Sequence, residues 1–168
     1  MSRINNTSEV IIAMTKYFQY DCRRINHFIK VYGFAKTIGE MEELDEEAQE
    51  ILEIAAITHD IGIKNSEIKY NSSAGNYQEI EGPEEAKKLL ENLGISHSII
   101  DRVCWLIAHH HTYSNIDKLD YQILVEADFI VNIFEDSVSD TAIKNIENNI
   151  FKTSTGKMLL GNLYKNGD

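Results

Sequence analysis

Four residues of types that bind metal ions occur in apolar surroundings, far apart along the chain. His27 falls within a helical pattern of apolar residues, and the pair His59-Asp60 ends a mostly apolar run. Asp128 is embedded in a long apolar segment. A buried carboxylate is unfavourable unless a cation, a proton or several hydrogen-bond donors neutralise it. One metal site that gathers all four side chains, together with His109 or His110 from a further helix, is the most economical explanation, and imidazole with carboxylate ligands suits Fe, Mn, Zn, Co or Ni.

Each of these residues also has an explanation without metal. His27 alone could be a core or partly exposed histidine. Asp60 could cap a helix or form a local ion pair, and Asp128 could be satisfied by N–H donors alone. Because these separate explanations would all have to hold at once, a shared metal site is favoured.

Three consecutive histidines, His109 to His111, end a further apolar helical pattern. His109 follows Leu106 by three residues, and His110 continues the apolar stripe that contains Val103. Helical spacing therefore lets either His109 or His110 point towards a site. The alternative is a surface run, which the negative C-terminal end of a helix stabilises when the imidazoles are protonated.

Helices must position these residues, because apolar residues recur at three- and four-residue spacing through most of the chain. The sequence predicts helices over about 8–20, 22–39, 46–58 with Asp45 as its cap, 83–93, 98–109 and 120–134, and one or two within 139–163. Nothing alternates with a period of two. We therefore expect a single all-α domain over residues 1–168, a compact bundle with its core at about 20–135 and the C-terminal helices 139–164 packed on it.

Residues 63–82 interrupt this pattern, since they are polar and have few periodic apolar positions. The sequence predicts a loop here, and a loop of this length more often serves a site than a core. Gly82-Pro83 would then begin the next helix, with proline in its first turn and acidic residues near its positive end.

Composition limits the possible partners. Of the 168 residues, 43% are hydrophobic and 26% are charged, which is ordinary for a folded globular protein. The formal charge of −11 argues against a nucleic-acid polymer as partner, because its phosphates bind basic surfaces. A small anionic phosphate substrate would need a bound cation to offset that charge. The sequence is compatible with a homo-oligomer.

No apolar stretch reaches the ~20 residues of a membrane-spanning helix, and no run of signal-peptide type opens the chain. We therefore expect no membrane partner and a cytoplasmic location. Cys22 and Cys104 are expected to be reduced thiols for the same reason.

The order His27, His59-Asp60, Asp128 resembles the H…HD…D pattern of the HD-domain superfamily of metal-dependent phosphohydrolases. The resemblance extends over about residues 20–135 and includes further matches. His59-Asp60-Ile61-Gly62 is similar to the family's frequent HDIG motif, Ala127-Asp128 to its terminal alanine-aspartate, and Arg24 stands three residues before His27. The resemblance implies a helical HD-domain bundle of the HDIG type.

The resemblance also implies roles for individual residues. His27, His59, Asp60 and Asp128 would hold a first divalent metal ion. In two-metal members Asp60 would bridge, and His109 or His110 would help to complete a second site. Glu81 stands before Gly-Pro, where those members often have histidine, and would be a further ligand.

The activity implied by the resemblance is hydrolysis of a phosphate ester or anhydride, with a nucleotide as the preferred substrate. Asp60 would orient the ions and hydroxide, while Arg24 and a protonated His109 or His111 would stabilise phosphoryl charge. One or two divalent ions per chain are expected, Mg²⁺ being a further candidate. The alternatives are a di-iron oxygenase, distinguished by colour, bound iron and oxygen uptake, and a non-catalytic nucleotide- or metal-sensing module, distinguished by binding without turnover.

Overall fold

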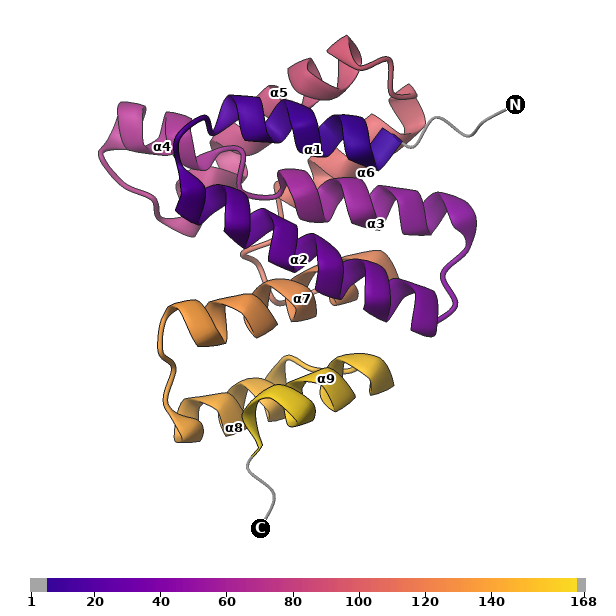
Figure 1. The fold of residues 1–168 in the computed structure, drawn as a ribbon, viewed down its shortest axis with the longest axis vertical. Coiled ribbons are helices and arrows are strands. Elements are labelled where there is room, and N and C mark those ends of the chain that lie inside the picture. Colours follow the sequence, from indigo (N-terminus) through magenta and orange to yellow (C-terminus); the bar gives the residue numbers. More distant parts are fainter. Residues whose placement is uncertain (1–5, 166–168) are drawn as a thin grey trace.

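The computed structural model describes residues 6–165, and within them the chain forms nine α-helices and no strand (Figure 1). The helices are α1 (Asn6–Tyr17), α2 (Cys22–Met41), α3 (Glu46–Thr58), α4 (Ile63–Tyr70), α5 (Gly75–Asn92), α6 (His97–Ile107), α7 (Leu119–Glu135), α8 (Asp140–Asn149) and α9 (Ser154–Tyr164). The predicted all-α class is confirmed.

Helix α3 lies at the centre of the bundle, in contact with α1, α2, α6 and α7 (Figure 1). Every residue from Ile51 to Thr58 is buried, as expected of a helix that is covered on all sides. Helix α2 packs along α3 and also along α7. Helices α2 and α7, which carry His27 and Asp128, and α3, which is followed by His59-Asp60, are therefore all in contact with one another.

Short polar side chains fix where these helices begin. The Asp45 carboxylate accepts a hydrogen bond from the backbone N–H of Ala48 and caps α3 as predicted. Asp21 caps α2 in the same way, by accepting from the N–H of Arg24. This cap sets the start of α2 five residues before His27.

The predicted loop over 63–82 is wrong, because α4 and the first half of α5 occupy most of it. Asn71 adopts a left-handed conformation (φ 50°) and ends α4. Pro83 lies inside α5 instead of in its first turn. Polar residues such as Ser66 and Gln78 take the buried positions while Ile68 and Ile80 are exposed, so the apolar spacing that indicates a helix is missing.

Two glycines explain how this polar segment packs against the core. A Cβ atom on Gly62 would lie 2.6 Å from both the Gln78 carbonyl oxygen and the Gly82 nitrogen, and one on Gly82 would lie 2.5 Å from an Ile107 methyl group. The turn after α3 therefore contacts the backbone of α5 directly. This contact holds α5 beside the segment that contains His59 and Asp60.

Two helices, α8 and α9, follow α7, and α9 packs on α7 and α2. The buried Glu126 of α7 joins them to the bundle by accepting hydrogen bonds from the Thr153 hydroxyl and from the backbone N–H groups of Lys152 and Thr153. Among the described helices, none combines the length and the apolar character needed to cross a membrane.

Candidate metal centre

Three helical segments bring four ligand atoms together in the core. His27 comes from α2, His59 and Asp60 from the end of α3 and the turn after it, and Asp128 from α7. His27 Nε2 lies 3.3 Å from His59 Nε2 and 3.2 Å from both Asp60 Oδ2 and Asp128 Oδ1. His59 Nε2 lies 3.4 Å from each of the same two oxygens.

The spacing of these atoms fits the edges of a coordination polyhedron. Nitrogen and oxygen ligands at about 2.1 Å from an ion lie about 3.0–3.4 Å apart in octahedral or tetrahedral geometry. The observed separations of 3.2–3.4 Å fall within that range. The spacing of His27, His59 and Asp60 therefore suits one divalent ion, and Asp128 Oδ1 lies beside both imidazole nitrogens that would face it.

Hydrogen bonds on the far side of each imidazole fix which nitrogen faces the centre. His59 Nδ1 lies 2.7 Å from the Ala56 carbonyl oxygen, and His27 Nδ1 lies 2.8 Å from a carboxylate oxygen of Glu135. These partners accept, so Nδ1 carries the proton and the Nε2 lone pair points inwards. Two lone pairs and two carboxylates facing one another require positive charge between them.

The pKa values of the metal-free cluster also show that positive charge is favoured between these side chains. Burial lowers the pKa of His27, but hydrogen bonds to Asp128 and Asp60 outweigh it and raise the pKa to about 10. Burial opposes charge on His59 as well, yet Asp60 and Asp128 hold its pKa well above the usual value. Protons and metal therefore compete for the same nitrogen atoms, so metal binding would release protons.

A second group of potential ligands consists of Asp60, His110 and His111, whose ligand atoms lie within 4.8 Å of one another. His110 Nε2 is 3.5 Å from Asp60 Oδ1, the carboxylate oxygen that does not face His27. His110 Nδ1 bonds the Ile107 carbonyl, and its buried Nε2 has no hydrogen-bond partner within the described residues. Asp60 thus stands between two ligand groups, as a bridging carboxylate would.

His111, which the sequence suggested as a protonated group beside the phosphoryl oxygens, is one of the clustered side chains. Burial and then the nearby His110 lower the pKa of His111 to about 4, so it is neutral near pH 7. Its backbone N–H donates to Glu79, and its ring contacts Gln78. A neutral imidazole suits metal ligation and does not suit the stabilisation of phosphoryl charge.

The structure does not bring two of the predicted ligands to the cluster. The His109 ring stacks on Trp105, with a centroid distance of 4.0 Å, and its Nδ1 bonds the Trp105 carbonyl. Glu81 accepts hydrogen bonds from Lys69 and Tyr70. His109 also belongs to neither ligand group and is not among the residues that line the cleft beside them.

A cleft of about 420 Å³ opens onto the ligand groups. Apart from Ile63, the residues that line it are polar or charged: Asp21, Arg23, Arg24, His27, Asp60, Ser73, Gln78, His111, Asp128, Asn132, Glu135 and Asp136. Arg24, the predicted phosphoryl-binding residue, is paired with Asp21 and Glu67. Arg23 forms no ion pair with any residue in 6–165, and is the freer of the two cations.

These features define a metal-binding helical bundle with its site open to a polar cleft. A family model of the HD domain matches residues 24–149, and the chain therefore belongs to the HD domain family. The structure is similar to the crystal structure of a predicted HD superfamily hydrolase from an uncultured Thermotogales bacterium. The TM-score is 0.69, at 26% identity over 98% of this chain and 88% of that chain. Among curated proteins, none matches the chain.

Sequence reasoning missed three side chains around the site. Besides Arg23, these are Asn132, whose amide donates to Asp128 Oδ1 at 3.0 Å, and Glu135, which bonds His27. The sequence did contain a pattern that could have indicated Asn132 and Glu135. They follow Asp128 by four and seven residues, and such spacing places side chains on one face of a helix.

Proposed function

We propose that this chain is a metal-dependent phosphohydrolase that cleaves a phosphate ester or anhydride, with a nucleotide as the first substrate class to test. The observation that carries the proposal is the position of Asp60, with one carboxylate oxygen towards each ligand group at the base of the cleft. Membership of the HD domain family and similarity to a predicted HD superfamily hydrolase support it.

The protein's own groups have separate tasks in this reaction. His27, His59, Asp60 and Asp128 would hold one ion, and Asp60 with His110 and His111 a second. Bound there, divalent metal makes water more acidic and polarises the phosphoryl oxygen. The cationic side chains at the mouth would attract and orient the anionic substrate, which the acidic chain would otherwise repel.

We also propose a small-molecule substrate in a reducing, cytoplasmic setting. The cleft of about 420 Å³ suits a ligand of that size, whereas a charge of −11 opposes a nucleic-acid polymer. Cys22 and Cys104 are free thiols, which suits a reducing compartment.

Removal of metal is expected to abolish hydrolysis. Chelation followed by desalting should leave apoprotein with less than about 1% of the starting rate, because the metal supplies several kcal/mol of transition-state stabilisation. Re-addition of Mn²⁺, Fe²⁺, Zn²⁺, Co²⁺, Ni²⁺ or Mg²⁺ one at a time should restore it for at least one ion. Release of phosphate or nucleotide from nucleoside monophosphates, cyclic nucleotides and dinucleoside phosphates is the measurement.

Two results would contradict phosphate hydrolysis and favour another function. Metal-loaded protein that binds a nucleotide without turning over any of the panel would indicate a sensing module. Coloured protein with about two iron atoms per chain and oxygen uptake would indicate a di-iron oxygenase.

The two arginines at the cleft mouth should differ in effect. We expect Arg23→Ala to raise KM about tenfold or more, because a charge-assisted contact with phosphate contributes about 1.5–3 kcal/mol. Arg24→Ala should have a smaller effect, since Asp21 and Glu67 already engage its guanidinium. Steady-state kinetics with Arg23→Lys as the charge-retaining control tests this, and a larger loss in Arg24→Ala than in Arg23→Ala would contradict it.

A further inference from the structure

His27 is oriented in a different way from the other two buried histidines of the cluster. His59 and His110 donate their Nδ1 protons to backbone carbonyls three residues earlier, those of Ala56 and Ile107. His27 instead donates to the side chain of Glu135, at 2.8 Å. Its orientation therefore depends on a residue that substitution can change.

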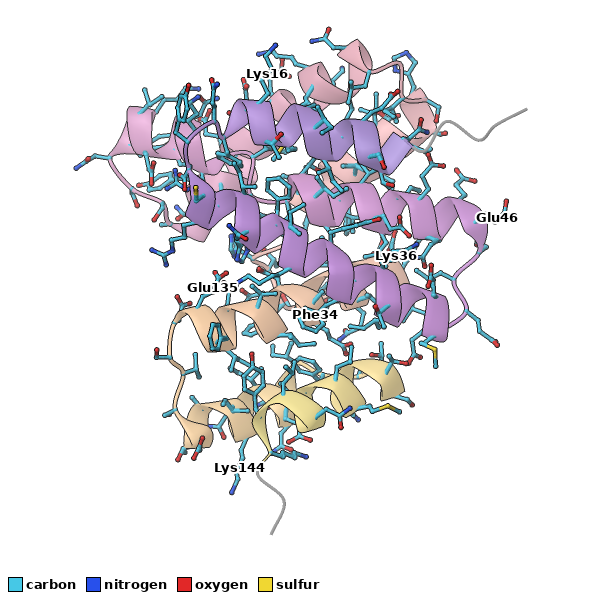
Figure 2. The ribbon with its side chains drawn as sticks, viewed as in Figure 1. Lys16, Phe34, Lys36, Glu46, Glu135 and Lys144 are labelled. Atoms are coloured by element: carbon cyan, nitrogen blue, oxygen red, sulfur yellow. The ribbon has the colours of Figure 1, made fainter. Side chains whose placement is uncertain are left out.

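Glu135 is itself held in place. It is the last residue of α7, and its side chain is 15% exposed, near the end of α7 that lies beside α2 (Figure 2). Its second oxygen pairs with Lys30 Nζ at 2.6 Å. Lys30 and His27 are three residues apart on α2, so both oxygens of Glu135 are bound by the same helix.

The same face of α7 carries a direct ligand and this carboxylate. Asp128 precedes Glu135 by seven residues, or about two helical turns. Because α7 packs on α2, Asp128 Oδ1 lies 3.2 Å from Nε2 of His27. The Glu135 carboxylate contacts Nδ1, on the other side of the same ring. The two helices hold the imidazole from both sides.

We propose that Glu135, held by Lys30, is a positioning residue that fixes the tautomer and orientation of His27 and thereby sets the affinity of the cluster for divalent metal. A carboxylate that accepts the Nδ1 proton makes Nε2 a stronger donor to the ion and keeps its lone pair directed inwards. The inference rests on the metal site of the proposed function but not on phosphate hydrolysis.

Calorimetric titration of the apoprotein with Zn²⁺ tests the proposal. Glu135→Ala should weaken Zn²⁺ binding about 10–100-fold, the usual effect of losing such a partner. Glu135→Gln should weaken it less, because the amide oxygen can still accept the Nδ1 proton. Lys30→Met should give an intermediate loss, since the carboxylate remains but is no longer held.

The matched control is Glu147→Ala, which breaks another lysine–glutamate pair, that with Lys165, on helix α8 away from the site. It should leave Zn²⁺ affinity unchanged. The Nδ1 proton of His27 in the Zn²⁺-loaded protein provides a second readout: it should exchange slowly with water in the wild type, where Glu135 accepts its hydrogen bond, and quickly in Glu135→Ala.

Equal Zn²⁺ affinity in Glu135→Ala and Glu147→Ala would overturn the proposal. If Glu135→Ala does not fold, Glu135→Gln and Lys30→Met decide, and wild-type affinity in both would overturn it equally. Protein that binds Zn²⁺ as expected but hydrolyses no phosphate compound would contradict the proposed function and leave this inference standing.

Discussion

Asp60→Asn is expected to lower kcat/KM about 10³-fold or more and to reduce the metal content of the purified protein. Oδ2 of Asp60 lies 3.2 Å from His27 Nε2, while Oδ1 lies 3.5 Å from His110 Nε2. An amide offers one ligating oxygen and no charge, so it cannot serve both groups. A loss of about 4 kcal/mol of transition-state stabilisation corresponds to this change in rate.

Elemental analysis and steady-state kinetics are the measurements for this variant. Asp101→Asn is the control, because Asp101 is an exposed carboxylate of α6 and belongs to neither ligand group. It should keep wild-type metal content and rate. Full metal occupancy in Asp60→Asn with a rate within tenfold of the wild type would exclude a bridging role.

The residues that could be predicted from the sequence are those whose burial is costly without a partner. Asp128 within an apolar segment and His59-Asp60 at the end of one had to meet a cation or donors, and the structure places both carboxylates beside the imidazoles of His27 and His59. The apolar spacing of α2, α3 and α7 was strong enough to locate those helices to within a few residues.

The histidine run shows why the second ligand group was predicted less well. Helix α6 ends at Ile107, and the next residues follow turn hydrogen bonds, such as that from the His109 N–H to the Leu106 carbonyl. Extending the helical stripe therefore indicated His110 correctly but could not place its neighbours. His109 turns to Trp105, while His110 and His111 face Asp60.

Glu81 was misplaced for a related reason. Its partners Lys69 and Tyr70 belong to α4, a helix that the sequence did not indicate. Short polar helices that are stabilised by tertiary contacts have little periodic signal of their own. Contacts made by such a segment can be found only once the packing is known.

Gly62→Ala is expected to destabilise the fold by about 3 kcal/mol, at the upper end of the cost of overpacking. Gly62 has φ −71°, which alanine adopts without strain, so backbone conformation is not the cause. The new Cβ would instead lie 2.6 Å from the Gln78 oxygen and the Gly82 nitrogen. Both are backbone atoms, and no side-chain rotation can relieve the contact.

Gly33→Ala provides the matched control, because a Cβ on Gly33 of α2 would meet nothing within 4 Å. Within a helix this change should stabilise the protein by about 0.5–1 kcal/mol. Urea denaturation of the two variants should therefore shift the midpoint in opposite directions. A shift of the same sign and size in both would show that the contact between Gly62 and α5 does not constrain the fold.

Gly62→Ala should also weaken the metal site. To accommodate the Cβ, the turn after α3 must move away from α5, and that turn contains Asp60, while α5 contains Gln78, which contacts His111. Zn²⁺ affinity should therefore fall in Gly62→Ala even at temperatures where the variant is fully folded. Unchanged affinity in folded Gly62→Ala would mean that the ligand groups keep their arrangement without help from the glycine contact.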